Sequence, residues 1–252
     1  MGEAFVALAA WQVASYGVAW FAALYFGSAL LTSWLTRYAC PRIGLGRVLD
    51  TRPLAPGQIR REIGEASVSI LVFGVGLIVP WSLLRTGWAR VEPDPASWRV
   101  ALEIGVLFLW NELHFYVSHR LLHTRALRRF HAGHHRSHVP TPFSTYAFHP
   151  VEAVMLGSVP LIPMLLHDFS FQALAALTVM SIALNSLGHA NYEFTRSAPA
   201  RGLLGASRRH QQHHARYRGN FGFLLPWFDR WLDTALPEEA LRAPCSRPDD
   251  RP

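Results

Sequence analysis

Histidines gather at three places in this sequence, in patterns that suit metal binding. The clusters read HRLLH, HAGHH and HQQHH, and they hold eight of the thirteen histidines: His119, His123, His131, His134, His135, His210, His213 and His214. Residues three and four apart lie on one face of a helix, so each cluster can direct its imidazoles toward a common point. The spacing therefore predicts metal binding.

The number of these imidazoles favours two metal ions over one. Neighbours such as His134 and His135 point about 100° apart on a helix, so one can bind the first ion and the other the second. A structural zinc site uses four ligands and a facial-triad iron site three, which are fewer than eight. His189 could add a ninth imidazole, with Asn185 one turn earlier. The alternative interpretation is a polar helix surface at a membrane interface.

Several other kinds of metal site do not fit the sequence. Cys40 and Cys245 are the only cysteines and lie far apart, which excludes a disulfide framework and a thiolate site. The ExxH pairs of carboxylate-bridged di-iron bundles are absent, and the clusters lie outside the uncharged segments, unlike the histidines of a membrane haem protein. Transporters bind their cargo near the bilayer midplane, whereas the spans here lack ionisable residues at their centres. A membrane metal-handling protein, the alternative outside the enzymes, is therefore disfavoured.

Long uncharged segments must hold these clusters at a membrane. Half of the 252 residues are hydrophobic and 16% are charged, and the mean hydropathy is +0.14. A helix of about 20 residues crosses a bilayer. Residues 4–35 and 66–84 can each cross, and residues 98–110 begin a third span. Residues 153–166 and 169–187 predict a membrane hairpin whose first arm need not cross fully. We therefore expect an all-α, polytopic membrane protein with about four spans.

The arginines predict which side of the membrane carries the histidines. The net charge is +7, all basic residues are arginines, and six of them lie between the first two spans but only three between the second and third. Positive residues in short loops are retained in the cytoplasm. Residues 114–150 and the chain after His189 then share the cytoplasmic side, as a helical cap that holds the dimetal site. No basic stripe with stacking aromatics suggests a nucleic-acid partner.

The order of the clusters resembles the fatty acid hydroxylase and sterol desaturase superfamily of membrane di-iron oxygenases. The resemblance covers about Asn111 to Thr234 and includes FYVSHRLLH, RRFHAGHHRSHVPTPFSTYAFHPVE, GHANYE and HQQHHARYRGNFGFLLPWFDRWLDT. The block PTPFSTYAFHPVE, from Pro140 to Glu152, is most similar to sterol C-5 desaturases and their bacterial relatives. Asp233 stands where relatives commonly have Gly, a difference that we expect to concern a turn.

The resemblance implies the ligands, cofactors and partners of the site. It implies two iron ions, which zinc can replace in preparations, with O2 as co-substrate and a membrane lipid as substrate. No segment that would bind a flavin, a nicotinamide or a haem is visible, so we expect the electrons to come from a separate reductase with a ferredoxin or cytochrome b5-like carrier. The arginines could dock an acidic carrier of this kind. Whether Asn185, His138 or His149 joins the site stays open. The implied metal ligands are His119, His123, His131, His134, His135, His189, His210, His213 and His214.

The sequence then predicts three parts and one class of activity. Residues 1–100 hold N-terminal membrane helices and a cytoplasmic loop, residues 101–236 form the catalytic domain, and residues 237–252 form a disordered tail. The expected protein is an O2-dependent lipid oxidoreductase of a bacterial inner membrane, with its active site on the cytoplasmic side. Sterol desaturation of the C-5 type is the leading activity. Hydroxylation of a fatty acyl, carotenoid or other bacterial lipid is the alternative.

Overall fold

The computed structural model of this protein describes residues 2–195 and 202–242. Within these residues the secondary structure is almost entirely helical, apart from an antiparallel pair of short strands, β1 (Arg47–Val48) and β2 (Tyr192–Glu193). Four helical segments are long and apolar enough to cross a membrane: Ala10–Arg42, Gln58–Arg85, Ser97–Leu122 and Phe171–Gly188. The prediction of an all-α, polytopic membrane protein with about four spans is therefore confirmed.

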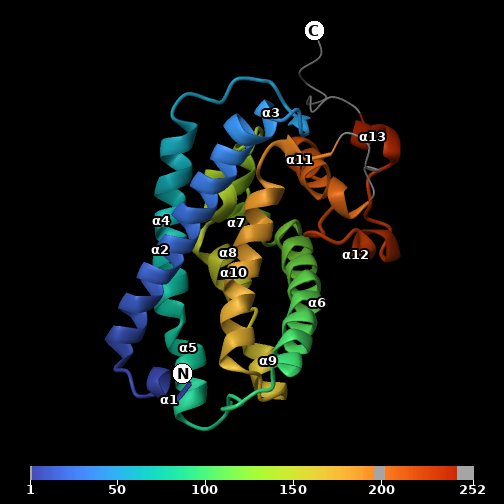
Figure 1. Cartoon of the computed structure of the whole chain (residues 1–252). Helices are drawn as coiled ribbons and strands as arrows, with labels where there is room; N and C mark the ends of the chain where they lie inside the picture. The colour runs from blue at the N-terminus through green and yellow to red at the C-terminus, as the bar shows by residue number, and fades with distance from the viewer. Residues whose placement is uncertain (1, 196–201, 243–252) are drawn as a thin grey trace.

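The spans form helices because a bilayer core offers no water to backbone groups, and a helix satisfies these groups internally. Their elements are α2 (Ala10–Trp34), the π-helical turn η1 (Leu35–Ala39) and α3 (Cys40–Arg42) in the first span, α4 (Gln58–Gly76) and α5 (Ile78–Arg85) in the second, α6 (Ser97–Leu122) in the third and α10 (Phe171–Gly188) in the fourth. Figure 1 shows the N-terminus, α5 and α9 at one end of these helices, and α3, α11 and α13 at the other.

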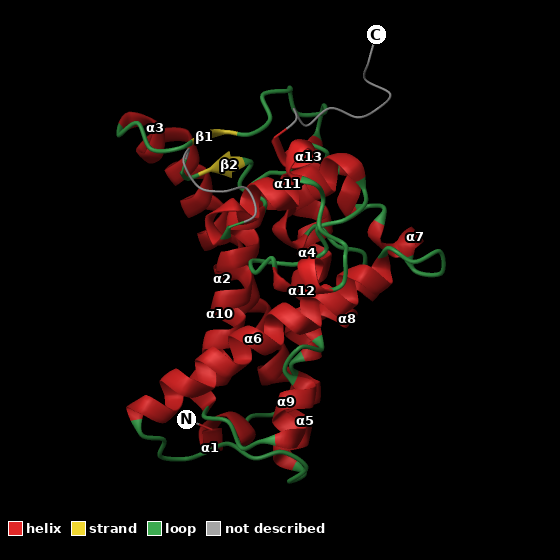
Figure 2. Cartoon of the chain, turned by 90° about the vertical axis from the view of Figure 1, so that its right-hand side faces the viewer, coloured by secondary structure: helices red, strands yellow, loops and turns green. Residues whose placement is uncertain are grey.

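Short elements complete the fold, and many of them lie near the end that carries α11. They are α1 (Gly2–Val6), α7 (Arg128–His131), η2 (His134–Arg136), η3 (Pro142–Tyr146), α8 (Pro150–Gly157), α9 (Leu161–Leu166), η4 (Leu203–Gly205), α11 (Ala206–Arg216), α12 (Trp227–Trp231) and α13 (Glu238–Arg242). Figure 2 shows β1 and β2 at the same end as α11 and α13. The loop after the first span, the histidine-bearing segments and the last helices therefore meet at one end of the molecule.

The first arm of the predicted hairpin is too short to be a span. It consists of α8 and α9, which together reach only from Pro150 to Leu166. Pro160 is the N-cap residue of α9 and Pro163 lies within it, and proline lacks the backbone N–H that continues a helix. Only the second arm, α10, has the length and hydropathy of a span.

Two features near the C-terminus bear on the sequence predictions. Asp233 has a φ of 53°, the left-handed conformation that glycine adopts most readily, so the departure from the family pattern does concern a turn. Part of the segment that we expected to be disordered is helical, because α13 packs Leu241 against Leu236. Residues 243–252 lie outside the described residues.

The first two spans are held close together by a pair of glycines. A Cβ atom added to Gly74 would lie 2.4 Å from Cγ2 and 2.5 Å from the backbone nitrogen of Val18, and one added to Gly17 would lie 2.7 Å from the carbonyl oxygen of Gly74. Small residues permit such an approach between membrane helices. Beside this crossing, Phe21 and Phe73 pack in a buried core that also includes residues of η3.

The glycine pair leads to a prediction about stability. We expect Gly74→Ala to lower the Tm of the detergent-purified protein, because the new methyl group must separate α2 from α4 at a cost of about 1–3 kcal/mol. Gly76→Ala is the matched control, since a Cβ there meets nothing within 4 Å and alanine favours a helix. Equal Tm values for the two variants would show that the close approach contributes nothing.

Candidate metal centre

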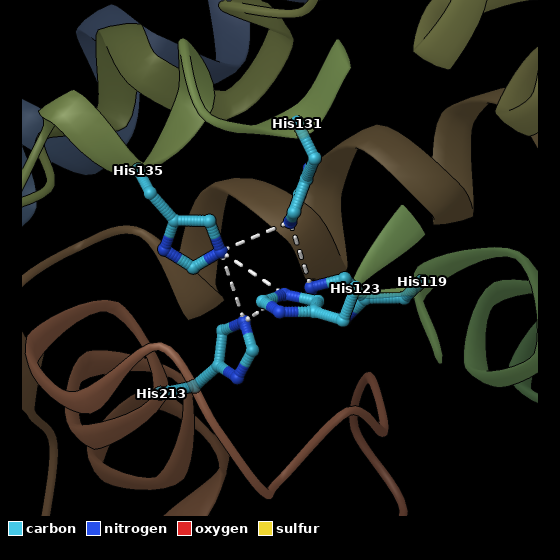
Figure 3. Close-up of side chains that lie close together, drawn as sticks. All are labelled: His119, His123, His131, His135 and His213. Carbon is cyan, nitrogen blue, oxygen red and sulfur yellow. Dashed lines mark hydrogen bonds between the residues drawn. The ribbon is translucent and has the colours of Figure 1, made fainter. Parts of the chain in front are cut away.

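All nine histidines named from the sequence converge in the structure, in two adjacent groups. Within each group the candidate ligand nitrogens all lie within 4.8 Å of one another. Figure 3 shows the larger group, in which five imidazoles from different segments point toward one another. The five-histidine group consists of His119, His123, His131, His135 and His213, and the four-histidine group consists of His134, His189, His210 and His214.

Helix ends and short helical turns place these side chains. His119 lies in the last turn of α6, His123 is its C-cap residue, and His131 ends α7. His189 is the C-cap residue of α10, whereas the remaining histidines lie on η2 and α11. The adjacent pairs divide between the two groups, His134 from His135 and His213 from His214. This division is the one that the rotation between successive helical residues predicts.

Within each group the imidazoles meet through their Nε2 atoms. Two such nitrogens can hydrogen-bond only if one of them carries a proton. The Nε2–Nε2 distances are 3.1 Å for His119–His131, 3.0 Å for His131–His135 and 3.1 Å for His123–His213 in the first group, and 3.2 Å for His134–His189, 3.0 Å for His189–His210 and 3.1 Å for His210–His214 in the second.

The hydrogen bonds of the Nδ1 atoms indicate that the ring proton lies on Nδ1 and not on Nε2. Carbonyl and carboxylate oxygens can only accept, so the Nδ1 atom that faces one of them carries the proton and leaves a lone pair on Nε2. The acceptors are the backbone oxygens of Phe221 for His119 (2.9 Å), Ala147 for His134 (3.3 Å), Asn185 for His189 (2.9 Å), Gly219 for His213 (2.7 Å) and Ser137 for His214 (3.1 Å), and Oε1 of Glu152 for His131 (2.7 Å).

This donor set fits metal ions. Lone pairs that face one another at 3.0–3.2 Å repel unless a cation lies between them. A metal–nitrogen distance of about 2.1 Å, with neighbouring ligands about 90° apart, places two nitrogens about 3.0 Å apart. The shortest distances within each group are therefore compatible with imidazoles that share one ion.

Burial keeps the imidazoles outside the spans in their neutral form. It lowers the pKa of His189 to about 4 and the pKa of His123 to about 3. Burial also lowers the pKa of His135 and of His214 well below the usual value, and neighbouring imidazoles add to the effect. Metal binding requires the neutral ring, so these histidines are ready to bind metal at neutral pH.

Buried carboxylates that the sequence analysis missed hold the histidine-bearing segments. Oε1 of Glu62 on α4 accepts hydrogen bonds from the side chains of Gln58 and Ser137, both at 2.7 Å, and Oε2 accepts one from Thr141 at 2.5 Å. The carbonyl of Ser137 in turn accepts the Nδ1 proton of His214. Glu62 thus fixes the loop after η2 and, through it, one ligand of α11. It lies 75 residues from Ser137 in sequence, so no spacing pattern reveals the contact.

Two further carboxylates hold the loop that follows α11. Glu112 accepts the backbone N–H of Leu225 at 2.6 Å, and Asp229 accepts those of Phe221 and Gly222 at 2.8 and 2.7 Å. Carbonyl oxygens of this loop accept the Nδ1 protons of two ligands, as described above. Glu112 and Asp229 therefore orient imidazoles indirectly, by fixing backbone.

The residues left open by the sequence analysis lie beside the two groups. Nδ1 of His138 and the hydroxyl of Tyr217 share a hydrogen bond of 2.8 Å, in which either can be the donor. His149 is the N-cap residue of α8, and its Nδ1 accepts the N–H of Val151. Neither belongs to a histidine group. Asn185 uses its backbone oxygen to orient His189, and its side-chain amide donates to the backbone of η3.

Histidines of both groups line a small cavity together with apolar residues. Its volume is about 10 Å³, close to what a single water molecule needs. A small reactant there would meet both imidazoles and hydrocarbon. The lining residues are the apolar Phe115, Leu122, Phe148 and Leu156, and the polar His119, His131, His134, His189, His210, Glu152 and Asn185.

Comparison with known proteins gives the family. The sequence model of the fatty acid hydroxylase family matches residues 104–234, just over half of the chain. The protein therefore belongs to the fatty acid hydroxylase family, a family of iron-dependent oxygenases. The histidine groups and the cavity all involve residues of this matched region.

The similar curated proteins are sterol oxidoreductases. The Delta(7)-sterol 5(6)-desaturase of Leptosphaeria maculans is 27% identical over 69% of this chain and 49% of its own length. Lathosterol oxidase of Mus musculus is 28% identical over 69% of this chain and 60% of its own, and a methylsterol monooxygenase of Aspergillus fumigatus is 28% identical over 62% and 55%. The chain thus spans about half the length of the curated relatives it matches. No solved structure matches it.

The lowered pKa values predict acid sensitivity of the metal-free protein. Unfolded histidine titrates near pH 6.5. Between pH 6.5 and about 4, His189 is therefore protonated in the unfolded state but neutral in the folded state. The free energy of unfolding is therefore highest above pH 6.5 and falls as the pH is lowered. A histidine of this kind contributes about 2 kcal/mol less at pH 5 than at pH 7.

The measurement is the Tm of chelator-treated protein between pH 7.5 and 5. We expect His189→Ala to lose part of the pH dependence, because it removes one of the buried imidazoles. His167→Ala, whose wild-type side chain is 51% exposed, should keep all of it. A Tm that does not change with pH would contradict the assignment of buried, neutral imidazoles.

Proposed function

We propose that this protein is a membrane-bound, di-iron, O2-dependent lipid oxidoreductase. The observation that carries the proposal is the pair of histidine groups, whose Nε2 lone pairs converge on two adjacent points. The five-histidine group would hold one iron and the four-histidine group the other. Imidazole also suits zinc, copper and nickel, so the choice of iron rests on the family.

Bound iron would supply the redox chemistry, namely reduction of O2 and removal of hydrogen from an unactivated C–H bond. The chain itself supplies position and the exclusion of water. Buried imidazoles hold the ions, the cap covers them, and Phe115, Phe148 and Leu156 present an apolar wall to the cavity. A substrate carbon that approaches from the membrane side would therefore meet the ions in a dry environment.

The electron balance requires an external donor. Hydroxylation of a C–H bond consumes O2, two electrons and two protons and yields an alcohol and one water. Desaturation consumes the same reactants, removes two hydrogens from neighbouring carbons and yields a double bond and two waters. We propose a one-electron carrier of the ferredoxin or cytochrome b5 type, reduced by a separate reductase.

Basic segments beside the histidines would dock this carrier. Residues 123–136 and 206–218 hold seven of the nine histidines and eight arginines, with no Asp or Glu. His123 is the least buried of the nine, and the exposed Tyr217 packs on the ring of His135 with 4.7 Å between ring centroids. Complementary charge speeds association and sets orientation. Arginine placement also supports a cytoplasmic position for this end, in a bacterial inner membrane.

For the substrate we propose a sterol or sterol-like lipid, with desaturation of the C-5 type. The names of the relatives support this choice, and so does the block from Pro140 to Glu152. Phe148 of this block lines the cavity, and Tyr146 stacks on Tyr25 with ring centroids 5.8 Å apart. The block thus forms a braced wall at the cavity, suited to a flat, rigid ring system. A hydroxylase of fatty acyl, carotenoid or other bacterial lipids is the second candidate.

Metal analysis of anaerobically purified protein tests the centre. We expect two irons per chain, with zinc as a possible replacement after overexpression. His135→Ala removes one ligand from the five-histidine group, and His214→Ala removes one from the four-histidine group. Each variant should bind one of the two ions more weakly and lose turnover, while membrane insertion persists. His167→Ala is the control. One ion per chain, or a haem absorption band, would contradict the proposal, and tight, reversible metal uptake without O2 consumption would favour a metal-handling protein.

Product analysis tests the reaction. The chain would be expressed in a sterol-producing host that lacks its own C-5 desaturase, and the membrane sterols profiled by mass spectrometry. A new ring double bond that requires His131 supports desaturation, and a product about sixteen mass units heavier supports hydroxylation. Purified protein supplied with a reduced acidic carrier should turn over more slowly at high salt, because salt screens the docking charges. Altered acyl chains with unchanged sterols would reject the sterol substrate.

A further inference from the structure

Glu152 differs from the other groups that orient the metal-binding histidines. Five described Nδ1 atoms donate to backbone carbonyls, whereas His131 donates to Oε1 of Glu152, at 2.7 Å. Both side chains are buried, with exposed fractions of 1% for Glu152 and 3% for His131. A carboxylate is a stronger acceptor than a carbonyl and makes the imidazole a stronger metal ligand. The two histidine groups are therefore unequal.

The second oxygen of Glu152 has no hydrogen-bond partner within the part of the chain that the structure describes. Oε2 is fully buried, and Glu152 lines the small cavity together with histidines from both groups. In either protonation state this oxygen needs a partner, because a buried polar atom left without one costs free energy. The cavity offers space for about one water molecule. Glu152 is also the only acidic residue among those that line it.

We propose that Glu152 is a positioning residue that binds at both ends of its carboxylate. Oε1 directs His131 toward the five-histidine ion, and Oε2 holds a single water molecule in the cavity between the ions and the apolar wall. The inference rests on the proposed dimetal centre. It assigns to this site a ligand of one chemical class, a water-sized hydrogen-bonding molecule, which a reacting O2 must displace or join.

The test compares Glu152→Gln and Glu152→Ala with wild type, using Co²⁺ as a spectroscopic probe. Glutamine keeps the shape and an oxygen for His131 but removes the charge, and alanine removes both contacts. Glu65→Gln is the matched control, because Oε2 of Glu65 on α4 is also buried without a hydrogen bond. This oxygen forms an ion pair with Nε of Arg61 at 3.8 Å, and Glu65 does not line the cavity. Cobalt affinity is measured by competition with a chelator, and the optical spectrum reports the coordination of each ion.

We expect Glu152→Gln to bind two cobalt ions, one of them about 10–100-fold more weakly than wild type, with a changed spectrum. Glu152→Ala should bind that cobalt ion more weakly still, and Glu65→Gln should bind both ions with wild-type affinity. In the iron-loaded enzyme, Glu152→Gln should lower kcat more than it raises KM, because the carboxylate contacts the centre and not the lipid. Wild-type affinity and spectrum in Glu152→Gln would overturn this inference alone. Fewer than two cobalt ions in wild type would overturn the dimetal centre and the inference with it.

Discussion

The structure depends on one electrostatic constraint, which is that the Nε2 atoms of nine imidazoles face one another in two buried groups. The oxygens that accept the Nδ1 protons fix six rings with Nε2 inward. Such an arrangement is repulsive unless cations occupy its two centres, so the energy that orders the cap must come from the rest of the fold or from bound metal. The chain meets this demand with buried carboxylates, Glu62, Glu112 and Asp229, which hold the backbone that orients the rings.

The membrane helices make this arrangement possible by bringing distant segments to one end. Histidines of α6 and α10 lie at the ends of two spans, where the chain leaves the apolar region and polar side chains are tolerated. The loop that carries η2 is fixed to α4, and α11 lies above them all. The histidine-bearing segments are thus tied to α4, α6 and α10. The two histidine groups therefore depend on how these three spans pack together.

The sequence predicted the helical class and the four spans from periodicity and hydropathy, and eight of the nine converging histidines from their spacing. His189 belongs to no cluster and was predicted from its place at the end of the last span, and the family resemblance then implied it as a ligand. Glu62 was not predicted, since it acts 75 residues away from Ser137. For Glu112 the sequence suggested either direct support of an imidazole or a solvated acid, whereas the structure shows that it accepts the backbone N–H of Leu225, 113 residues away. The short α13 was also missed, because five residues with one buried leucine leave almost no periodic signal.

The two histidine groups have different surroundings. The five-histidine group reaches nearest the surface at His123, beside the arginines, and contains the one imidazole that a carboxylate orients. The four-histidine group is wholly buried and has one imidazole fewer. Three of its histidines line the cavity, together with apolar residues of α6 and α8. The two groups therefore differ in exposure, in the number of imidazoles and in their share of the cavity lining.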